Sequence, residues 1–215
     1  MRAYDYYSLL QGAAVTVSLS VMGILLGVPL GLALALIRWA RVPLLSDAVA
    51  AYVSVLRATP LVTFILLVFF ALPNVGIPID PVPAAIVALA MNTSAFNCEI
   101  WRAALVDFPK TQLDAATAAG MTPGLAFRRI VFPQIWRVSL PGLVNEMTLL
   151  IKSSPAIAVT GIVDITRAAV RIGAQTYEPL PPFLVATALY FLVILGFVRA
   201  QRLVETHMGR KFGFA

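Results

Sequence analysis

The sequence contains very few of the side chains that build metal centres or covalent cross-links. Its 215 residues include one cysteine, Cys98, and one histidine, His207. A lone cysteine cannot form an intramolecular disulfide or a cysteine-cluster metal site. We therefore expect no catalytic residue, no metal and no cofactor bound by this chain. A phosphate-binding loop of the pattern Gly-x-x-x-x-Gly-Lys-Ser/Thr is also missing, which argues against a nucleotide-hydrolysing subunit of that class.

Charge is scarce as well. Only 12% of residues are charged and 60% are hydrophobic, with a mean hydropathy of +0.89, whereas soluble domains carry about 25% charged residues. The net charge is +6, but the basic residues lie between apolar runs, as membrane topology requires. The composition predicts contact with membrane lipid and no nucleic-acid partner.

Five apolar segments approach the length of about 20 residues that a membrane helix needs. They are residues 13–37, 49–72, 83–104, 138–161 and 183–198. We therefore predict an all-α integral membrane protein with five transmembrane helices, forming a single domain over residues 1–215.

The basic residues orient these spans. Eleven of them fall in the segments 38–48, 102–137 and 199–215, and three fall on the opposite side of the predicted membrane. Basic residues concentrate in cytoplasmic loops. The N-terminus is therefore predicted outside, and the C-terminus and the loop 107–134 in the cytoplasm.

The first span carries glycines at a regular spacing of four residues, at Gly23, Gly27 and Gly31. Small residues at this spacing allow two membrane helices to approach closely. We expect this face to pack against a neighbouring helix.

Four ionisable residues fall within predicted spans: Arg57, Glu99, Glu146 and Lys152. Each would cost about 2.5–3.5 kcal/mol at a helix centre facing lipid, so such groups face protein or a water-filled path. They are candidates for a translocation path. Glu99 has a structural alternative, an ion pair with Arg102 three residues later.

Two polar stretches extend this candidate set. Lys152 is followed by Ser153, Ser154 and a proline, which interrupts the helix and predicts either a cavity lining or a kinked packing site. Asn92 lies in an unusually polar part of the third span, where hydrogen bonding between helices is the alternative role.

The loop 107–134 predicts two short helices joined at a glycine. Gly120 can adopt the left-handed conformation that ends a helix. Thr122 is a predicted N-cap, with a proline at the first helical position. Pro133 is expected to end the second helix.

This loop resembles the cytoplasmic loop of ABC-transporter permeases, whose pattern is Glu-Ala-Ala, three residues, Gly, nine residues, Ile-x-Leu-Pro. The matching positions are Asp114, Ala115, Ala116, Gly120, Ile130 and Pro133, with Asp114 in place of Glu. In that family the loop docks on the ATP-hydrolysing subunit.

Other segments resemble the permeases of polar amino acid importers more narrowly. The second span has Arg57-Ala58-Thr59-Pro60 where that family has Arg-Gly-Thr-Pro, and Lys152 lies in the counterpart of its Leu-Lys-Asp-Thr-Ser run. Arg57, Thr59, Asn92, Glu99, Glu146, Lys152, Ser153 and Ser154 are the candidate residues of a translocation path or substrate site.

The resemblance implies an inner-membrane subunit that works with three kinds of partner. These are a second permease subunit, two ATPase subunits that bind ATP and Mg²⁺, and an extracytoplasmic binding protein that delivers an amino acid. Another small zwitterionic solute is an alternative cargo. A carrier without a motor is the alternative class, in which the intramembrane charges would couple transport to ions.

Overall fold

The structure, a computed structural model, describes residues 1–212, with side chains described for residues 1–200. All regular elements among these residues are helical, which confirms the predicted all-α class. The basic side chains of the C-terminal tail beyond Ala200 lie outside the described part.

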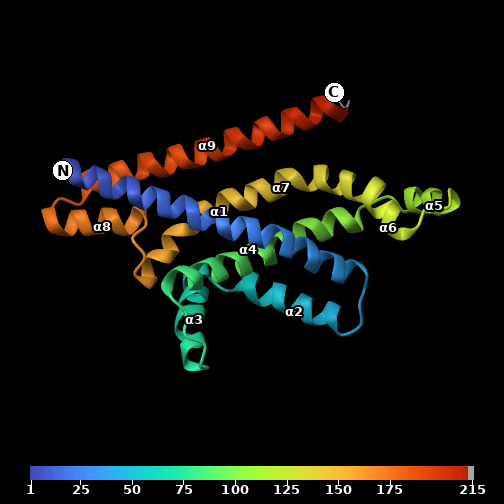
Figure 1. Cartoon of the computed structure of the whole chain (residues 1–215), viewed down its shortest axis with the longest axis horizontal. Helices are drawn as coiled ribbons and strands as arrows, with labels where there is room; N and C mark the ends of the chain where they lie inside the picture. The colour runs from blue at the N-terminus through green and yellow to red at the C-terminus, as the bar shows by residue number, and fades with distance from the viewer. Residues whose placement is uncertain (213–215) are drawn as a thin grey trace.

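The helices follow one another without long interruptions. In chain order they are α1 (Ala3–Trp39), α2 (Leu45–Ala58), α3 (Leu61–Asn74), α4 (Pro81–Val106), α5 (Lys110–Ala118), α6 (Pro123–Ala126), a π-helical turn (Phe127–Val131), α7 (Phe132–Ser153), a 3₁₀ segment (Ser154–Thr160), α8 (Ile165–Thr176) and α9 (Leu180–Phe212). The long helices run roughly side by side, with the N-terminus and α8 at one end and α5 and α6 at the other (Figure 1).

Two described helices are long and apolar enough to cross a membrane on their own, α1 and the part Leu180–Ala200 of α9. Two bent pairs raise the number to at most four: α2 with α3, bent by 113°, and residues 123–160 with α8, bent by 55°. The 26-residue α4 is about 39 Å long at roughly 1.5 Å per residue, enough to span a bilayer. Because its middle is polar, α4 is not among the two helices that are apolar enough to qualify.

A continuous helix over residues 49–72, as expected from the sequence, is not found. The helix breaks at Thr59, which is extended (φ −93°, ψ 128°), and restarts after Pro60. Proline disfavours the helical conformation of the residue before it. The chain therefore turns sharply, and α3 projects away from the main bundle (Figure 1).

The most extensive packing interface joins α1 to α4, and we call it the glycine seam. A Cβ atom at Gly23, Gly27 or Gly31 would come within 2.8 Å of a side-chain carbon on α4. Real Cβ atoms essentially never approach so closely. The four-residue glycine spacing thus lets two backbones touch, which confirms the expectation of close packing.

Pro133 does not end a helix, contrary to the prediction. The chain remains helical from α6 through the π-helical turn into α7, because the amide of Phe132 donates to the carbonyl of Phe127, five residues back. Pro133 lies in the first turn of α7, where a missing N–H costs little. The wider π turn absorbs the change of register that proline would otherwise force.

One helix, α8, had no counterpart among the predicted segments. Its buried residues (Ile165, Ala168, Ala169, Ile172) lie on one face only, so it is too amphipathic to be recognised as a span. It begins at Asp164, whose Oδ1 accepts from the amide of Arg167 at 2.8 Å. This N-cap is the sequence signal that would have identified it.

Candidate functional site

A cavity of about 300 Å³ lies between α2, α3, α4 and α7. Its lining combines polar and apolar side chains: Thr59, Leu61, Asn92, Phe96, Glu146, Leu149, Leu150 and Ser153. Four of the eight predicted path residues are in this set, brought together from segments far apart in the chain. Both helix breaks, at Thr59 and at Ser153, border the cavity.

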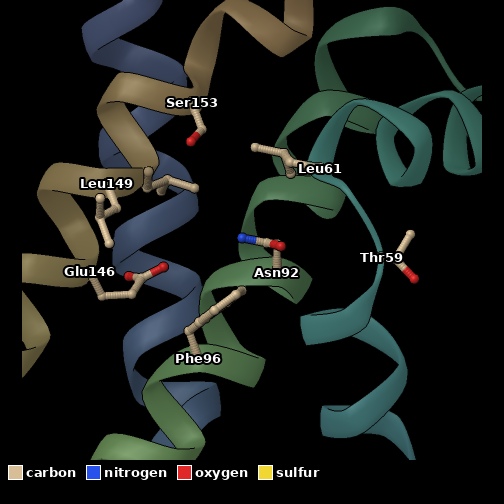
Figure 2. Close-up of a pocket in the computed structure, with 8 residues that line it drawn as sticks. Thr59, Leu61, Asn92, Phe96, Glu146, Leu149 and Ser153 are labelled. Atoms are coloured by element: carbon tan, nitrogen blue, oxygen red, sulfur yellow. The ribbon is translucent and has the colours of Figure 1, made fainter.

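The single carboxylate of the lining belongs to Glu146, whose exposed fraction is 6%. Its Oε2 accepts a hydrogen bond from Asn97 Nδ2 at 3.3 Å. Figure 2 shows the carboxylate directed from α7 toward Asn92 and Phe96 of α4. A buried carboxylate with one long hydrogen bond keeps most of its acceptor capacity, so a ligand in the cavity can use it.

Arg57 lies close to this cavity without lining it. Its guanidinium carbon is 5.5 Å from the centre of the Phe96 ring, within the range of a cation–π contact. Thr59, two residues on, donates its hydroxyl to the carbonyl of Val55 at 2.8 Å. Phe96 therefore contacts the Arg57 cation and also lines the cavity.

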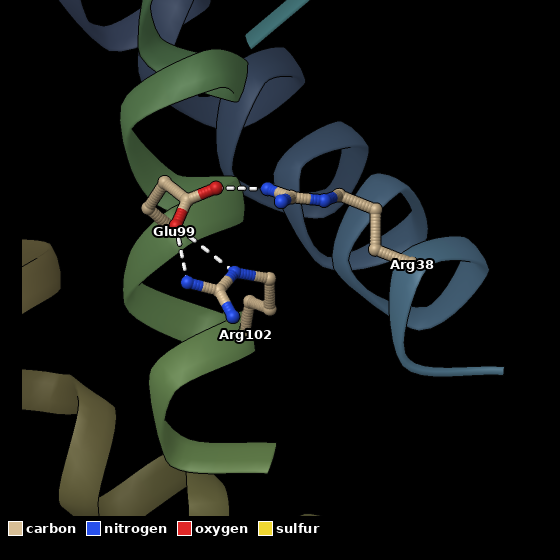
Figure 3. Close-up of polar contacts among 3 residues, drawn as sticks. All are labelled: Arg38, Glu99 and Arg102. Atoms are coloured by element: carbon tan, nitrogen blue, oxygen red, sulfur yellow. Dashed lines mark hydrogen bonds and ion pairs between the residues drawn. The ribbon is translucent and has the colours of Figure 1, made fainter. Parts of the chain in front are cut away.

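Glu99 belongs to a different site, near the end of α4 that leads to α5. Its carboxylate accepts from Arg102 Nε at 2.9 Å and Nη2 at 2.8 Å, which confirms the ion pair expected as the structural alternative. Arg38 of α1 binds the other oxygen (Figure 3). The sequence did not indicate Arg38 as a partner because the two residues are 61 positions apart.

Lys152, Ser153 and Ser154 lie at the junction of α7 with the 3₁₀ segment, so the predicted interruption of the helix is present. Only Ser153 lines the cavity. The Lys152 side chain is exposed, and Ser154 is buried with its hydroxyl donating to the carbonyl of Ile151 at 2.8 Å. Glu146 and Lys152 thus face different surroundings, as their six-residue spacing implies.

The helix pair α5–α6 forms the tip at one end of the molecule (Figure 1). Gly120 has φ +74°, its amide donates to Thr117, and the amide of Met121 donates to Ala116. These two bonds are the Schellman pattern, which confirms the predicted helix end at Gly120. Thr122 has the extended backbone of an N-cap, with Pro123 in the first turn of α6.

The structure divides the six predicted loop residues into two groups. Asp114, Ala115 and Gly120 are exposed, whereas Ala116, Ile130 and Pro133 are buried or half-buried. Helix α5 is also tied to α7 by a reciprocal amide pair between Gln112 and Gln134, at 2.7 and 3.4 Å. One group is open to a partner, and the other holds the tip on α7.

Metal-binding chemistry has no support in the described part of the chain, where no three His, Cys, Asp or Glu side chains are grouped to hold an ion.

Comparisons with known proteins agree with this architecture. Residues 27–210 match the family described as "Binding-protein-dependent transport system inner membrane component". The chain is 35% identical to the arginine transport system permease protein ArtQ of Bacillus subtilis (strain 168), covering 92% of this chain and 90% of that protein. It is 32% identical to the histidine/lysine/arginine/ornithine transport system permease protein HisQ of Escherichia coli (strain K12), over 88% and 84%.

Solved structures give the same result. A chain from the "Crystal structure of an amino acid ABC transporter with histidines" superposes with a TM-score of 0.84 at 32% identity, covering 94% of each chain. A chain of the MetNI methionine ABC transporter superposes with a TM-score of 0.82 at 19% identity, over 97% of this chain and 99% of that one. The latter likeness concerns the fold alone.

Proposed function

The chain belongs to the family of binding-protein-dependent transport system inner membrane components, and from this membership we propose that it carries a polar or charged amino acid through an ATP-driven importer. It is a transport permease of the inner membrane and not an enzyme, since its relatives are named permeases. ATP and Mg²⁺ belong to a separate ATPase subunit in this proposal. A second permease subunit and an extracytoplasmic binding protein complete the assembly.

Five membrane passes are proposed, with the N-terminus outside and the C-terminus in the cytoplasm. The passes are α1, α2 with α3, α4, α7 with its 3₁₀ extension, and α9. The arrangement in Figure 1 supports this orientation, because the α1–α2 loop and the tip α5–α6 lie at the same end. That end carries the basic residues Arg38, Arg41, Arg102 and Lys110, as the cytoplasmic side does.

The solute path is proposed to run through the cavity lined by Thr59, Asn92, Glu146 and Ser153. A volume of about 300 Å³ lies at the lower limit of pockets that hold small molecules. The buried Glu146 carboxylate is the observation that carries this proposal, since an intramembrane carboxylate is costly without a function. Lys152, Ser154 and Arg57 adjoin the path, whereas Glu99 lies outside it, in the ion cluster that it forms with Arg38 and Arg102.

Within that class, a basic amino acid fits the cavity best. The Glu146 carboxylate can pair with an ammonium or guanidinium group, and a carboxylate can accept two bonds from a guanidinium. The arginine and histidine/lysine/arginine/ornithine systems named above carry solutes of this kind.

The tip α5–α6 is proposed as the contact with the ATPase. Asp114, Ala115 and Gly120 offer an exposed face with small side chains, which a groove on the partner can approach closely. Ala116, Ile130 and Pro133 make the tip continuous with α7, so a displacement of the tip moves the helix that carries Glu146. ATP-driven closure of the ATPase pair would then switch the cavity between outward-open and inward-open states.

The test is the ATPase activity of the purified assembly in lipid, with and without a candidate binding protein, across a panel of amino acids. Stimulation by one loaded binding protein is the expected result and identifies the solute. If no ATPase copurifies and solute flux follows an ion gradient instead, the chain is a carrier without a motor and the proposal is wrong.

A further inference from the structure

A second cavity, of about 480 Å³, lies at the end of the molecule where α1 turns into α2 and α4 leads to α5. Its lining is strongly basic: Arg38, Trp39, Arg41, Ser46, Arg102, Val106 and Lys110. Four cations from three separate segments surround one space, and no carboxylate is among the lining residues. We name it the basic cavity.

Two of the four cations remain unpaired. Arg38 and Arg102 share the carboxylate of Glu99, which neutralises one of their two charges (Figure 3). Neither Arg41 nor Lys110 forms an ion pair within residues 1–200, and both are exposed. The cavity therefore has a net charge of about +3 and attracts an anion.

The backbone around the cavity adds to this attraction. The N-termini of α2 and α5 border it through Ser46 and Lys110, and neither helix has a side-chain cap. Uncapped helix N-termini offer amide N–H groups to phosphate oxygens. Arg41 and Leu44 also have positive φ, 51° and 61°, a strained conformation for residues other than glycine that is typical of ligand sites.

The lining segments and their neighbours also expose apolar side chains on the surface. Leu44 is 86% exposed and Val106 is 59% exposed, with Val42 and Leu45 also on the surface. A free phosphate gains nothing from contact with apolar side chains, whereas the acyl chains of a phospholipid can pack against them. Trp39, in the lining itself, is a residue typical of the headgroup level.

We propose that the basic cavity binds the phosphodiester headgroup of an anionic phospholipid of the cytoplasmic leaflet. The proposal rests on the membrane orientation given under the proposed function. Arg41 and Lys110 supply charge that Glu99 does not neutralise, and Arg38 and Arg102 also line the cavity. Occupancy would tie the α1–α2 loop to the first turn of α5, next to the ATPase contact.

The test counts lipid retained by the purified assembly. The assembly is equilibrated in nanodiscs of phosphatidylcholine or of an equal mixture of phosphatidylcholine and phosphatidylglycerol. Bound phosphatidylglycerol is then measured by native mass spectrometry after extraction into detergent. The variant is R41Q/K110Q. Its matched control, R128Q/R129Q, removes two exposed basic residues from the same side of the membrane but outside the cavity.

The expected result is retention about 30-fold weaker in R41Q/K110Q, at roughly 1 kcal/mol for each cation near the membrane surface. The control retains the lipid as the wild type does, and R41K/K110R restores it. Equal retention in the two glutamine variants overturns the proposal. Displacement of the lipid by inorganic phosphate identifies a free-anion site instead and also overturns it.

Retention is scored without solute or ATP, so this result is independent of the proposed transport function. An assembly that keeps phosphatidylglycerol but never responds to a loaded binding protein contradicts the transport function and leaves the lipid site intact.

Discussion

The two faces of α4 are built on opposite principles. Toward α1, Leu89, Thr93 and Asn97 pack against glycines so closely that no Cβ atom fits between the helices. Toward α2 and α7, Asn92 and Phe96 border a cavity of about 300 Å³. One helix is thus immobilised on one face and open on the other, and Asn97 links the two by touching Gly31 and donating to Glu146.

The two faces of α4 therefore have different mechanical roles. The glycine seam fixes α4 as a rigid wall, while the helices across the cavity are broken at Thr59–Pro60 and at Ser153–Ser154. A path that opens alternately to two sides needs one wall that holds and another that moves. Substitutions in the seam should therefore have the largest effect, followed by those in the cavity, the tip α5–α6 and the cluster of Arg38, Glu99 and Arg102.

The largest effect is expected at the centre of the seam. Gly27→Leu places a Cβ atom 2.7 Å from Thr93 and 2.8 Å from the carbonyl oxygen of Ala90. Because a backbone atom cannot rotate away, we expect a loss of about 3 kcal/mol or more. The measurement is the yield and thermal stability of monodisperse protein in detergent. Gly196→Leu is the control, since nothing lies within 4 Å of a Cβ at that position; equal losses in both variants would contradict a special role of the seam.

Glu146→Gln tests the open face of α4 and its partner α7. The amide keeps an oxygen that can accept from Asn97, so the fold should persist, but the side chain can no longer ionise to pair with a bound cation. We expect uptake of a basic amino acid into proteoliposomes to fall at least about tenfold, or roughly 1.4 kcal/mol, with unchanged thermal stability. The exposed Glu178→Gln is the control. Normal uptake in the Glu146 variant would remove this carboxylate from the solute path.

How far the sequence predicts these features depends on the range of the interaction. The seam follows from glycine spacing within α1, and the Glu99–Arg102 pair follows from a separation of three residues. The contact of Arg38 with Glu99 spans 61 positions and needs the fold. Prolines show the same limit. Pro60 breaks a helix, but Pro133 does not, because Pro133 follows a π turn that no local sequence pattern predicted.

The candidate path also depends on contacts between residues that are far apart in the sequence. Polarity, depth and the family resemblance indicated eight residues, but none of these gives the rotation of each helix. Thr59, Asn92, Glu146 and Ser153 face the cavity, whereas Lys152 is exposed and Ser154 turns back on its own helix. Only the packing of α2, α4 and α7 around the cavity selects among them.

Gly120→Val tests the tip α5–α6. A side chain at this position has room, but the backbone is in the left-handed conformation that disfavours one. Nothing lies within 4 Å of a Cβ at Gly120, but its φ of +74° costs a β-branched residue about 1–2 kcal/mol. We expect the end of α5 to shift, ATP-driven uptake to fall several-fold, and membrane insertion to remain normal. Gly124→Val is the matched control, because Gly124 also has open space and no positive φ. Unchanged uptake in the Gly120 variant would contradict the role of the tip as a lever.

The smallest effects are expected in the ion cluster, where Arg38 and Arg102 share the carboxylate of Glu99. The exposed side-chain fractions are 20% for Arg38, 35% for Arg102 and 21% for Glu99, so solvent screens the Arg102 pair more. Ion pairs near the surface contribute about 0–1 kcal/mol.

Arg102 also lies only three residues from Glu99 on the same helix, so its pair adds little beyond local helix stability. Arg38 joins α1 to α4 and extends the seam toward the end of the molecule that carries α5 and α6. Arg38→Gln should therefore lower the thermal stability more than Arg102→Gln, and Glu99→Gln should lower it most, since it leaves two arginines facing each other. A double-mutant cycle of Arg38 with Glu99 measures the coupling directly, and a coupling of zero would mean that the glycine contacts hold the two helices without it.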